Sequence, residues 1–257
     1  MMPAYFFAHG APSLVLEQHS YSDFLKNFAS TRPRPKAIVI FSAHWEARSV
    51  QKVSAVGTYS TIYDFSGFQD ELYQMTYPAS GNRALSEQIQ ALFAQHGIPS
   101  ELDETRGLDH GAWAVLKLVY PDADIPVIAL SVNPMLTNEQ QYQIGKALGA
   151  LREQDVLIIG SGGTVHNLRR LNWRAAEADA WAVQFDEWLE SKLTSWDTEA
   201  LFRYREQAPH AIDSVPTTEH FIPLFLAMGA GDANRKATLI HRSYQLGSLS
   251  LSCWQFD

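Results

Sequence analysis

Short apolar runs alternate along this chain with longer stretches in which apolar residues recur at helical spacing. Four of the runs are almost continuously apolar, which is typical of strands covered by helices on both faces. These runs span residues 5–8, 37–43, 125–132 and 156–159. Near the C-terminus, 237–243 and 248–256 alternate apolar with polar residues and predict an antiparallel strand pair, with Gly247 in its turn.

Helical periodicity predicts five helices between and after these runs. They span residues 21–29, 82–96, 112–119, 138–151 and 176–193. Gly97 and Pro99 are typical of the end of the second helix, and Asn82 is typical of its start. Strands that alternate with helices predict an α/β fold, in which a mostly parallel central sheet is flanked by helices. We expect one domain over residues 1–257, with the antiparallel pair added at the C-terminal end.

Composition and charge narrow the class of protein. Of the 257 residues, 46% are apolar and 19% charged, which is typical of a globular chain. The net charge of -8 repels phosphate groups, so we expect no nucleic-acid partner. No stretch approaches the roughly 20 apolar residues of a membrane helix, and the N-terminus lacks the features of a secretory signal. We therefore expect a cytoplasmic location, and we expect the single Cys253 to be a core residue.

Three of the nine histidines follow predicted buried strands: His9, His44 and His166. The carboxyl ends of parallel strands meet at one edge of a sheet, and ligands of open α/β sheets bind there. A lone histidine after a strand is usually an ordinary loop residue, but three at equivalent positions favour a shared site. Because neutral imidazole is a common ligand of zinc and of non-haem iron, the pattern indicates a metal site.

Two more histidines precede predicted helices. His220 comes before a helix whose later residues are apolar, and Thr217 or Thr218 can cap that helix. The alternative for His220 is a surface residue near the cap. His110 follows Asp109, so it is either incidental to an Asp109 cap or a polar donor at the rim of a cleft. We interpret the other four histidines as structural: His19, His96, His210 and His241.

The glycine-rich segment 160–163 also follows a predicted strand. It lacks the spacing of dinucleotide-binding and phosphate-binding loops, so it instead indicates glycines that let the backbone approach a metal centre. The chain contains neither a G-x-S-x-G motif nor an HExxH motif. A serine hydrolase and a zincin-type protease are therefore unsupported.

Taken together, the histidine segments and several flanking motifs resemble one known family. The motifs lie at 8–13, 41–46, 63–68, 72–73, 77–81, 108–113, 160–168, 218–224, 241–243 and 247–250. In this order they resemble the class III extradiol ring-cleavage dioxygenases (the LigB superfamily), and within them the single-domain DOPA 4,5-dioxygenase-like subgroup. The match extends over nearly the whole chain.

The resemblance implies an enzyme that opens the ring of a catechol such as DOPA with dioxygen. It implies that His9, His44 and His220 bind one divalent metal ion. It also implies that His166 either ligates this metal or acts as acid and base, and that His110 contacts substrate or dioxygen. Three histidines are also a zinc pattern, so we expect Fe(II) for activity and Zn(II) in purified protein.

Further expectations concern the surroundings of the metal. Glu46 and Glu219 flank predicted ligands and can orient them. Tyr63 and Trp45, with Phe65 and Tyr73, can wall an apolar substrate pocket or belong to the plain core. Two alternative functions stay open at this point: a zinc-dependent hydrolase on the same three histidines, and a Memo-type binding protein without catalysis.

Overall fold

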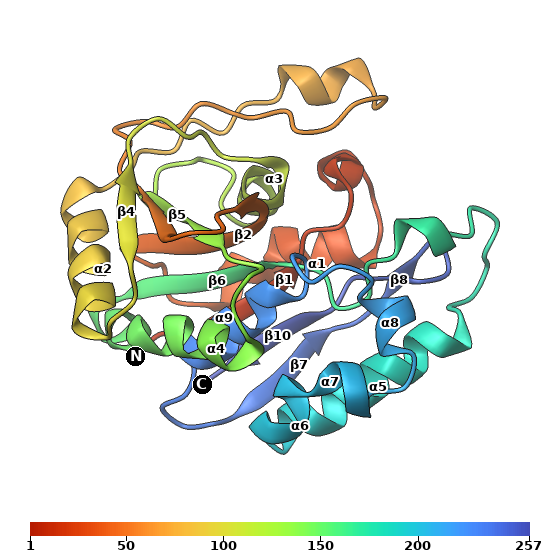
Figure 1. The fold of residues 1–257 in the computed structure, drawn as a ribbon. Coiled ribbons are helices and arrows are strands. Elements are labelled where there is room, and N and C mark those ends of the chain that lie inside the picture. The colour runs from red at the N-terminus through yellow and green to blue at the C-terminus, as the bar shows by residue number, and fades with distance from the viewer.

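The computed structural model describes residues 1–257 and is built around an eight-stranded sheet (Figure 1). The strand order is β4-β3-β5-β2-β6-β1-β10-β7. The strands are β1 (Ala4–Ala8), β2 (Ala37–Glu46), β3 (Gln51–Ser54), β4 (Ser100–Asp103), β5 (Val127–Val132), β6 (Val156–Gly162), β7 (Ala237–His241) and β10 (Cys253–Phe256). A separate two-stranded sheet pairs β8 (Tyr244–Gln245) with β9 (Leu249–Ser250).

The centre of the large sheet is parallel, as predicted. Strands β5, β2, β6 and β1 pair in parallel, with Ile38 opposite Leu157 and Tyr5 opposite Ile159. The predicted C-terminal pair is present as β7 and β10, which are antiparallel. Because β10 also pairs with β1, this pair extends the main sheet rather than forming a unit of its own. The expected α/β fold class is confirmed.

Helices cover both faces of the sheet. They are α1 (Ser20–Phe28), α2 (Arg83–Gln95), α3 (His110–Val119), α4 (Asn138–Ala147), α5 (Ala180–Thr194), α6 (Thr198–Phe202), α7 (Tyr204–Gln207), α8 (Ala211–Ser214) and α9 (Ile222–Ala230). All five predicted helices are present. The predicted 138–151 helix is shorter than expected, because a 3-10 helix (Gly149–Gln154) follows α4. The short helices α6 to α8 were not predicted, and they gather beside α5 (Figure 1).

Alternation along the strands separates the core into two layers. Ile38 and Ile40 of β2 pack into one layer with α1 and α3, whereas Val39 and Phe41 pack into the other with α2, α4, α5 and α9. Successive side chains of a strand point to opposite faces, so a continuously apolar strand supplies both layers. No helix of the structure is long and apolar enough to cross a lipid bilayer.

The edge of the sheet differs most from the expectation. Strands β3 and β4 were not predicted, because their sequences QKVS and SELD contain no apolar run. Strand β2 continues to Glu46 beyond the predicted end, and its pairing with β5 shifts between Phe41 and Glu46. His44 therefore lies inside an irregular strand end rather than in a loop.

Candidate metal centre

Five histidines from five segments line one cleft of about 1040 Å³. His9 directly follows β1, His44 lies near the end of β2, and His166 follows β6. His110 is the first residue of α3, and His220 comes two residues before α9. The structure therefore brings together all five histidines that the sequence singled out.

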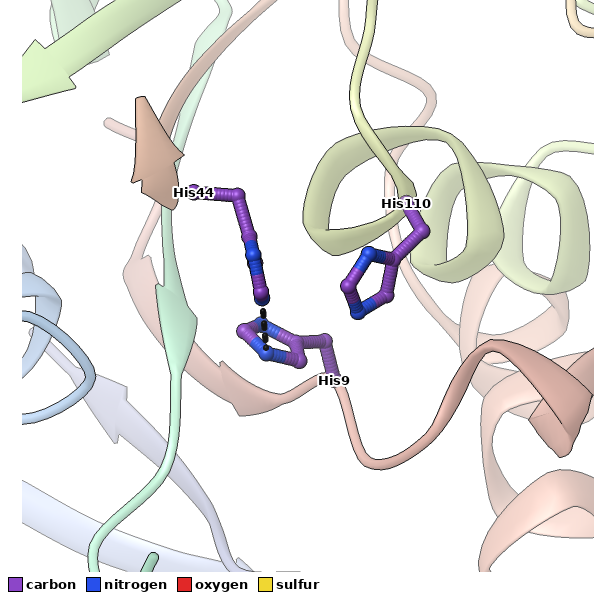
Figure 2. A group of neighbouring side chains, drawn as sticks. All are labelled: His9, His44 and His110. Atoms are coloured by element: carbon purple, nitrogen blue, oxygen red, sulfur yellow. Dashed lines mark hydrogen bonds between the residues drawn. The ribbon is translucent and has the colours of Figure 1, made fainter. Parts of the chain in front are cut away.

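Two pairs of ring nitrogens, both including His44, lie very close together. His44 Nε2 lies 3.1 Å from His9 Nε2 and 3.3 Å from His220 Nε2. Figure 2 shows the rings of His9, His44 and His110 directed toward a common point. His9, His44 and His110 each have one ring nitrogen within 4.8 Å of a ring nitrogen of the other two. His9 and His44 thus form the centre of the cluster, with His220 and His110 on either side.

The outer ring nitrogens face acceptors, and this fixes the positions of the ring protons. The Ser161 hydroxyl donates to the carbonyl of Gly111, so it accepts from His9 Nδ1 at 3.1 Å. His220 Nδ1 donates to Glu219 Oε1 at 3.1 Å, as predicted for a residue that orients a ligand. His44 Nδ1 lies 3.3 Å from Asp64 Oδ2. With their protons on Nδ1, these imidazoles direct unprotonated Nε2 atoms toward one another.

Asp64 is a site residue that the sequence reasoning missed. Its Oδ1 accepts from the backbone N–H of His110 at 2.9 Å and lies 3.0 Å from His110 Nδ1, while its Oδ2 faces His44. Burial raises the pKa of Asp64, but the contacts with His110 and then His44 outweigh this and lower it to about 2. The residue lies in the 63–68 motif, which was the only available signal. Asp64 is therefore an anionic link between two of the rings.

Burial keeps His9, His44 and His166 neutral. It lowers the pKa of His9 well below its usual value, with further lowering from the neighbouring His44 ring. Burial, followed by the charge of His110, lowers the pKa of His44 to about 2. For His166, burial and then His220 lower the pKa to about 3. Neutral imidazole is the form that binds metals, so at neutral pH these rings need not lose a proton first.

Two glycines permit the close approach of the segments that carry the histidines. A Cβ on Gly162 would lie 2.1 Å from the carbonyl oxygen of His220, which accepts from the N–H of Gly163 at 2.8 Å. A Cβ on Gly111 would lie 2.9 Å from Cδ2 of His44. Only a residue without a side chain fits at these positions. Gly162 therefore lets the backbone of β6 approach the backbone at His220, whereas the approach of segment 160–163 to a metal ion stays a prediction.

The start of α3 is held by a buried carboxylate. Asp109 caps the helix by accepting from the N–H of Ala112 at 3.2 Å, and it also accepts from the Ser42 hydroxyl at 2.6 Å. Arg106 lies 3.0 Å from the same carboxylate and donates to the carbonyl of His44. These contacts tie His110 to the end of β2. An Asp109 cap and a His110 at the cleft are both present, so the two interpretations of this segment are compatible.

The start of α9 differs from the expectation. Neither Thr217 nor Thr218 caps the helix through its side chain, because the Thr217 hydroxyl donates to Glu219 at 2.8 Å. The carbonyl of Thr218 instead accepts from the backbone N–H groups of Phe221 and Ile222. The backbone thus turns tightly just after His220. Glu219 is thereby placed against His220, and the contacts with His220 and Thr217 lower its pKa to about 2 despite partial burial.

His166 does not join the group of converging nitrogens. Its ring stacks on that of His220, with 3.6 Å between ring centroids and 8° between the planes. Its backbone N–H donates to the carbonyl of Ser214. The side chain still lines the cleft. His166 is therefore placed beside the cluster, with its ring parallel to that of His220.

Three predicted neighbours of the site lie elsewhere. Trp45 packs under Arg106 and belongs to the core layer of Ile38 and Ile40. The Tyr63 hydroxyl donates to the carbonyl of Met75 at 2.8 Å, and its ring packs against Trp113. Neither lines the cleft, so their role in substrate binding stays a prediction. Glu46 contacts Arg48 rather than His44, so it does not orient that ring.

Apolar residues that the sequence reasoning did not assign form the cleft walls. Phe65 was expected in the pocket together with Tyr63, and it does line the cleft; Tyr73 does not. The remaining apolar wall consists of Ala11, Pro12, Phe68, Leu168, Leu171, Trp173, Leu246 and Leu249. Ala11, Pro12, Phe68, Leu168 and Leu249 lie in the motifs that carry the family resemblance, whereas Leu171, Trp173 and Leu246 lie in loops without a periodic pattern and had no such signal. The cleft thus combines a polar floor of histidines with aromatic and aliphatic walls, an arrangement suited to a small aromatic ligand.

Comparison with known proteins supports the interpretation of this cleft as the site of an enzyme. The family described as the catalytic LigB subunit of aromatic ring-opening dioxygenase matches residues 3–252. The chain belongs to this family, and it is a metal-dependent extradiol dioxygenase. This class excludes the zinc hydrolase and the binding protein that the sequence left as alternatives.

Individual relatives narrow the comparison. The chain is 41% identical to a 4,5-DOPA dioxygenase extradiol of Beta vulgaris over 256 residues, covering 98% of this chain and 95% of the relative. It is 39% identical to a protein of the same name from Escherichia coli (strain K12), covering 97% and 93%. A crystal structure of an uncharacterized Escherichia coli K12 protein covers all of both chains with a TM-score of 0.85 and 36% identity.

Proposed function

We propose that this enzyme opens the ring of a catechol such as DOPA with dioxygen, using one Fe(II) ion held by His9, His44 and His220. The relatives named 4,5-DOPA dioxygenase extradiol support the substrate class. Fe(II), when bound, supplies the redox chemistry that joins catechol and dioxygen. Zn(II) suits the same nitrogens and binds such sites more tightly than Fe(II), so we expect zinc in protein purified without added iron.

The spacing of the Nε2 atoms carries the assignment of the ligands. Two nitrogens bound to one ion at about 2.1 Å lie about 3.0–3.4 Å apart when the angle between the bonds is about 90° to 109°. The observed separations from His44 Nε2 are 3.1 Å and 3.3 Å. Without a cation, unprotonated nitrogens at this distance repel each other. The His44–His9 and His44–His220 pairs therefore each have a spacing that fits one shared metal ion.

His110 competes with His220 for the third ligand position. One of its nitrogens lies within 4.8 Å of those of His9 and His44. Its Nδ1, however, lies beside Asp64, whereas His220 Nε2 lies only 3.3 Å from His44 Nε2. We assign His220 to the metal and His110 to the substrate or dioxygen. On this assignment, His220→Ala loses bound metal, and His110→Ala keeps it but loses turnover.

His166 is assigned to proton transfer. It lines the cleft next to the ligand cluster, and its buried ring is neutral, so a ring nitrogen is free to accept a proton. Such a base can accept a proton from a catechol hydroxyl and return it later. Its parallel stacking on His220 favours this role over metal ligation. The neighbouring His110 is positioned to act as the second proton-transfer group.

The decisive experiment measures oxygen uptake and absorbance on adding L-DOPA or a simple catechol to protein reconstituted with Fe(II) without oxygen. We expect one oxygen molecule consumed for each catechol and a coloured ring-opened product. The zinc-loaded protein is the control and is expected to be inactive. Absence of oxygen uptake across a panel of catechols would refute the proposed reaction.

A further inference from the structure

The partly exposed wall of the cleft carries a carboxylate that the reaction does not use. Glu17 lines the cleft and is reached from His9 along the segment 10–13, which forms part of the same wall. Its side chain is 33% exposed. The Ser13 hydroxyl donates to Glu17 Oε1 at 2.6 Å, and the Gln245 amide donates to Oε2 at 2.7 Å. The carboxylate therefore has a fixed orientation.

No neighbouring cation neutralises Glu17. His19 Nε2 donates to Glu17 Oε2 at 3.0 Å. His19 Nδ1, however, caps α1 by accepting from the backbone N–H groups of Tyr21 and Ser22, so this nitrogen carries no proton. An imidazole with only one ring proton is neutral. Glu17 therefore keeps its full negative charge.

The rest of the cleft wall makes this charge distinctive. Glu17 is the only carboxylate that lines the cleft, and no Lys or Arg lines it. The donors from Ser13, Gln245 and His19 outweigh partial burial and lower the pKa of Glu17, which keeps it ionised at neutral pH. A carboxylate offers about four acceptor positions. Three are occupied, so one remains for a ligand in the cleft.

We propose that Glu17 selects catechols whose side chain ends in a protonated amine. This inference rests on the proposed function, in which the catechol ring lies at the histidines. The ammonium of the side chain donates to Glu17, while the aromatic and aliphatic walls hold the carbon skeleton. A catechol with an acidic side chain would place a second negative charge beside Glu17. The carboxylate of an amino acid such as DOPA has no cationic partner on the cleft wall, so the amine decides the preference.

The test compares kcat/KM for catechols that differ in charge: dopamine, 4-ethylcatechol and 3,4-dihydroxyphenylpropionate, with L-DOPA as a fourth. We expect the Fe(II) enzyme to prefer dopamine and L-DOPA to 4-ethylcatechol, and 4-ethylcatechol to the acid. In Glu17→Gln, the ratio for dopamine over 4-ethylcatechol should fall roughly ten-fold or more, mainly through KM, as for the loss of one charged hydrogen bond. The exposed Glu101→Gln is the control and should keep the ratio.

A binding measurement that needs no turnover separates this inference from the proposed reaction. Tyramine should bind more tightly than 4-ethylphenol to the metal-loaded protein in calorimetry, and Glu17→Gln should abolish the difference. If catechols are opened but charge has no effect, or if Glu17→Gln lowers kcat/KM equally for every catechol, the inference is wrong and the reaction stands. If no catechol is opened but tyramine is still preferred, the reaction alone is wrong.

Discussion

Two groups of histidines in this molecule use the same side chain for different purposes. In the inner group, His9 and His220 donate from Nδ1 to Ser161 and Glu219, and their Nε2 atoms face His44. In the outer group, His19 uses Nδ1 to cap α1, and His241 packs on the rings of Tyr21 and Phe24. Burial lowers the pKa of His241, as it does for His9 and His44.

The comparison shows that burial alone does not make a metal site. What distinguishes the inner group is that an acceptor holds the outer nitrogen of each ring, so the free lone pairs converge on one point. In the outer group, the available nitrogens are used by a helix N-terminus, by Glu17 and by Ser243. The partner of the second nitrogen therefore decides whether an imidazole can bind a metal.

The largest expected effect separates the two groups directly. His44→Ala removes the ring that faces both His9 and His220, and we expect it to lose bound metal and to lower kcat/KM by a thousand-fold or more, on the order of 4 kcal/mol. His241→Ala should keep full metal content and most activity, because its contacts are with aromatic rings. Metal analysis and oxygen uptake on both variants test this. Equal losses in the two variants would erase the distinction.

A second substitution tests whether the inner group depends on the close approach of the backbone at Gly162 to the carbonyl of His220. Gly162→Ala places a methyl group 2.1 Å from the carbonyl oxygen of His220 and must push α9 away from β6. We expect a loss of about 3 kcal/mol in the free energy of unfolding, the upper end for overpacking, together with weaker metal binding. Urea unfolding measures the first and metal titration the second. Gly57→Ala is the matched control, since its Cβ would meet nothing within 4 Å.

A substitution at Asp64 tests whether the carboxylate that contacts His44 and His110 contributes to metal affinity. Asp64→Asn keeps the shape but loses the charge that faces His44 and His110. We expect metal affinity to fall about ten-fold or more, as for other substitutions of residues that hydrogen-bond to a metal ligand. The free energy of unfolding should change little. Competition with a chelator measures the affinity, and the exposed Asp122→Asn is the control. Unchanged affinity would mean that the rings alone fix the site.

The smallest effect concerns a buried group outside both sites. Burial raises the pKa of the Cys253 thiol to about 12, and the thiol lies 3.2 Å from the Tyr21 hydroxyl. We expect no reaction of the native protein with a thiol reagent at pH 8, and stoichiometric reaction after unfolding in urea. Labelling followed by mass spectrometry measures both. Rapid labelling of the folded chain would show that this strand opens easily.

Local patterns predicted the central strands and the helices that cover them, because a strand buried on both faces needs a continuous apolar run. The same reasoning missed β3 and β4, whose polar sequences are stabilised by pairing at the edge of the sheet. It also missed Asp64, because a lone aspartate in a loop resembles many surface residues. Trp45, which was predicted in the pocket, packs in the same core layer as Ile38 and Ile40, because the irregular end of β2 interrupts the alternation of the strand.

The sequence by itself determined that histidines follow parallel strands, since strand direction places such residues at one edge. It also marked the glycines beside them. Only the tertiary structure decided which nitrogen of each ring is free, because Ser161, Asp64 and Glu219 reach the rings through hydrogen bonds and ion pairs that depend on the folded arrangement. The charge at Glu17 was likewise decided by the fold, because it depends on the bond between His19 and the start of α1. Local sequence fixes where a side chain leaves the backbone, whereas its protonation and direction depend on neighbours that only folding brings together.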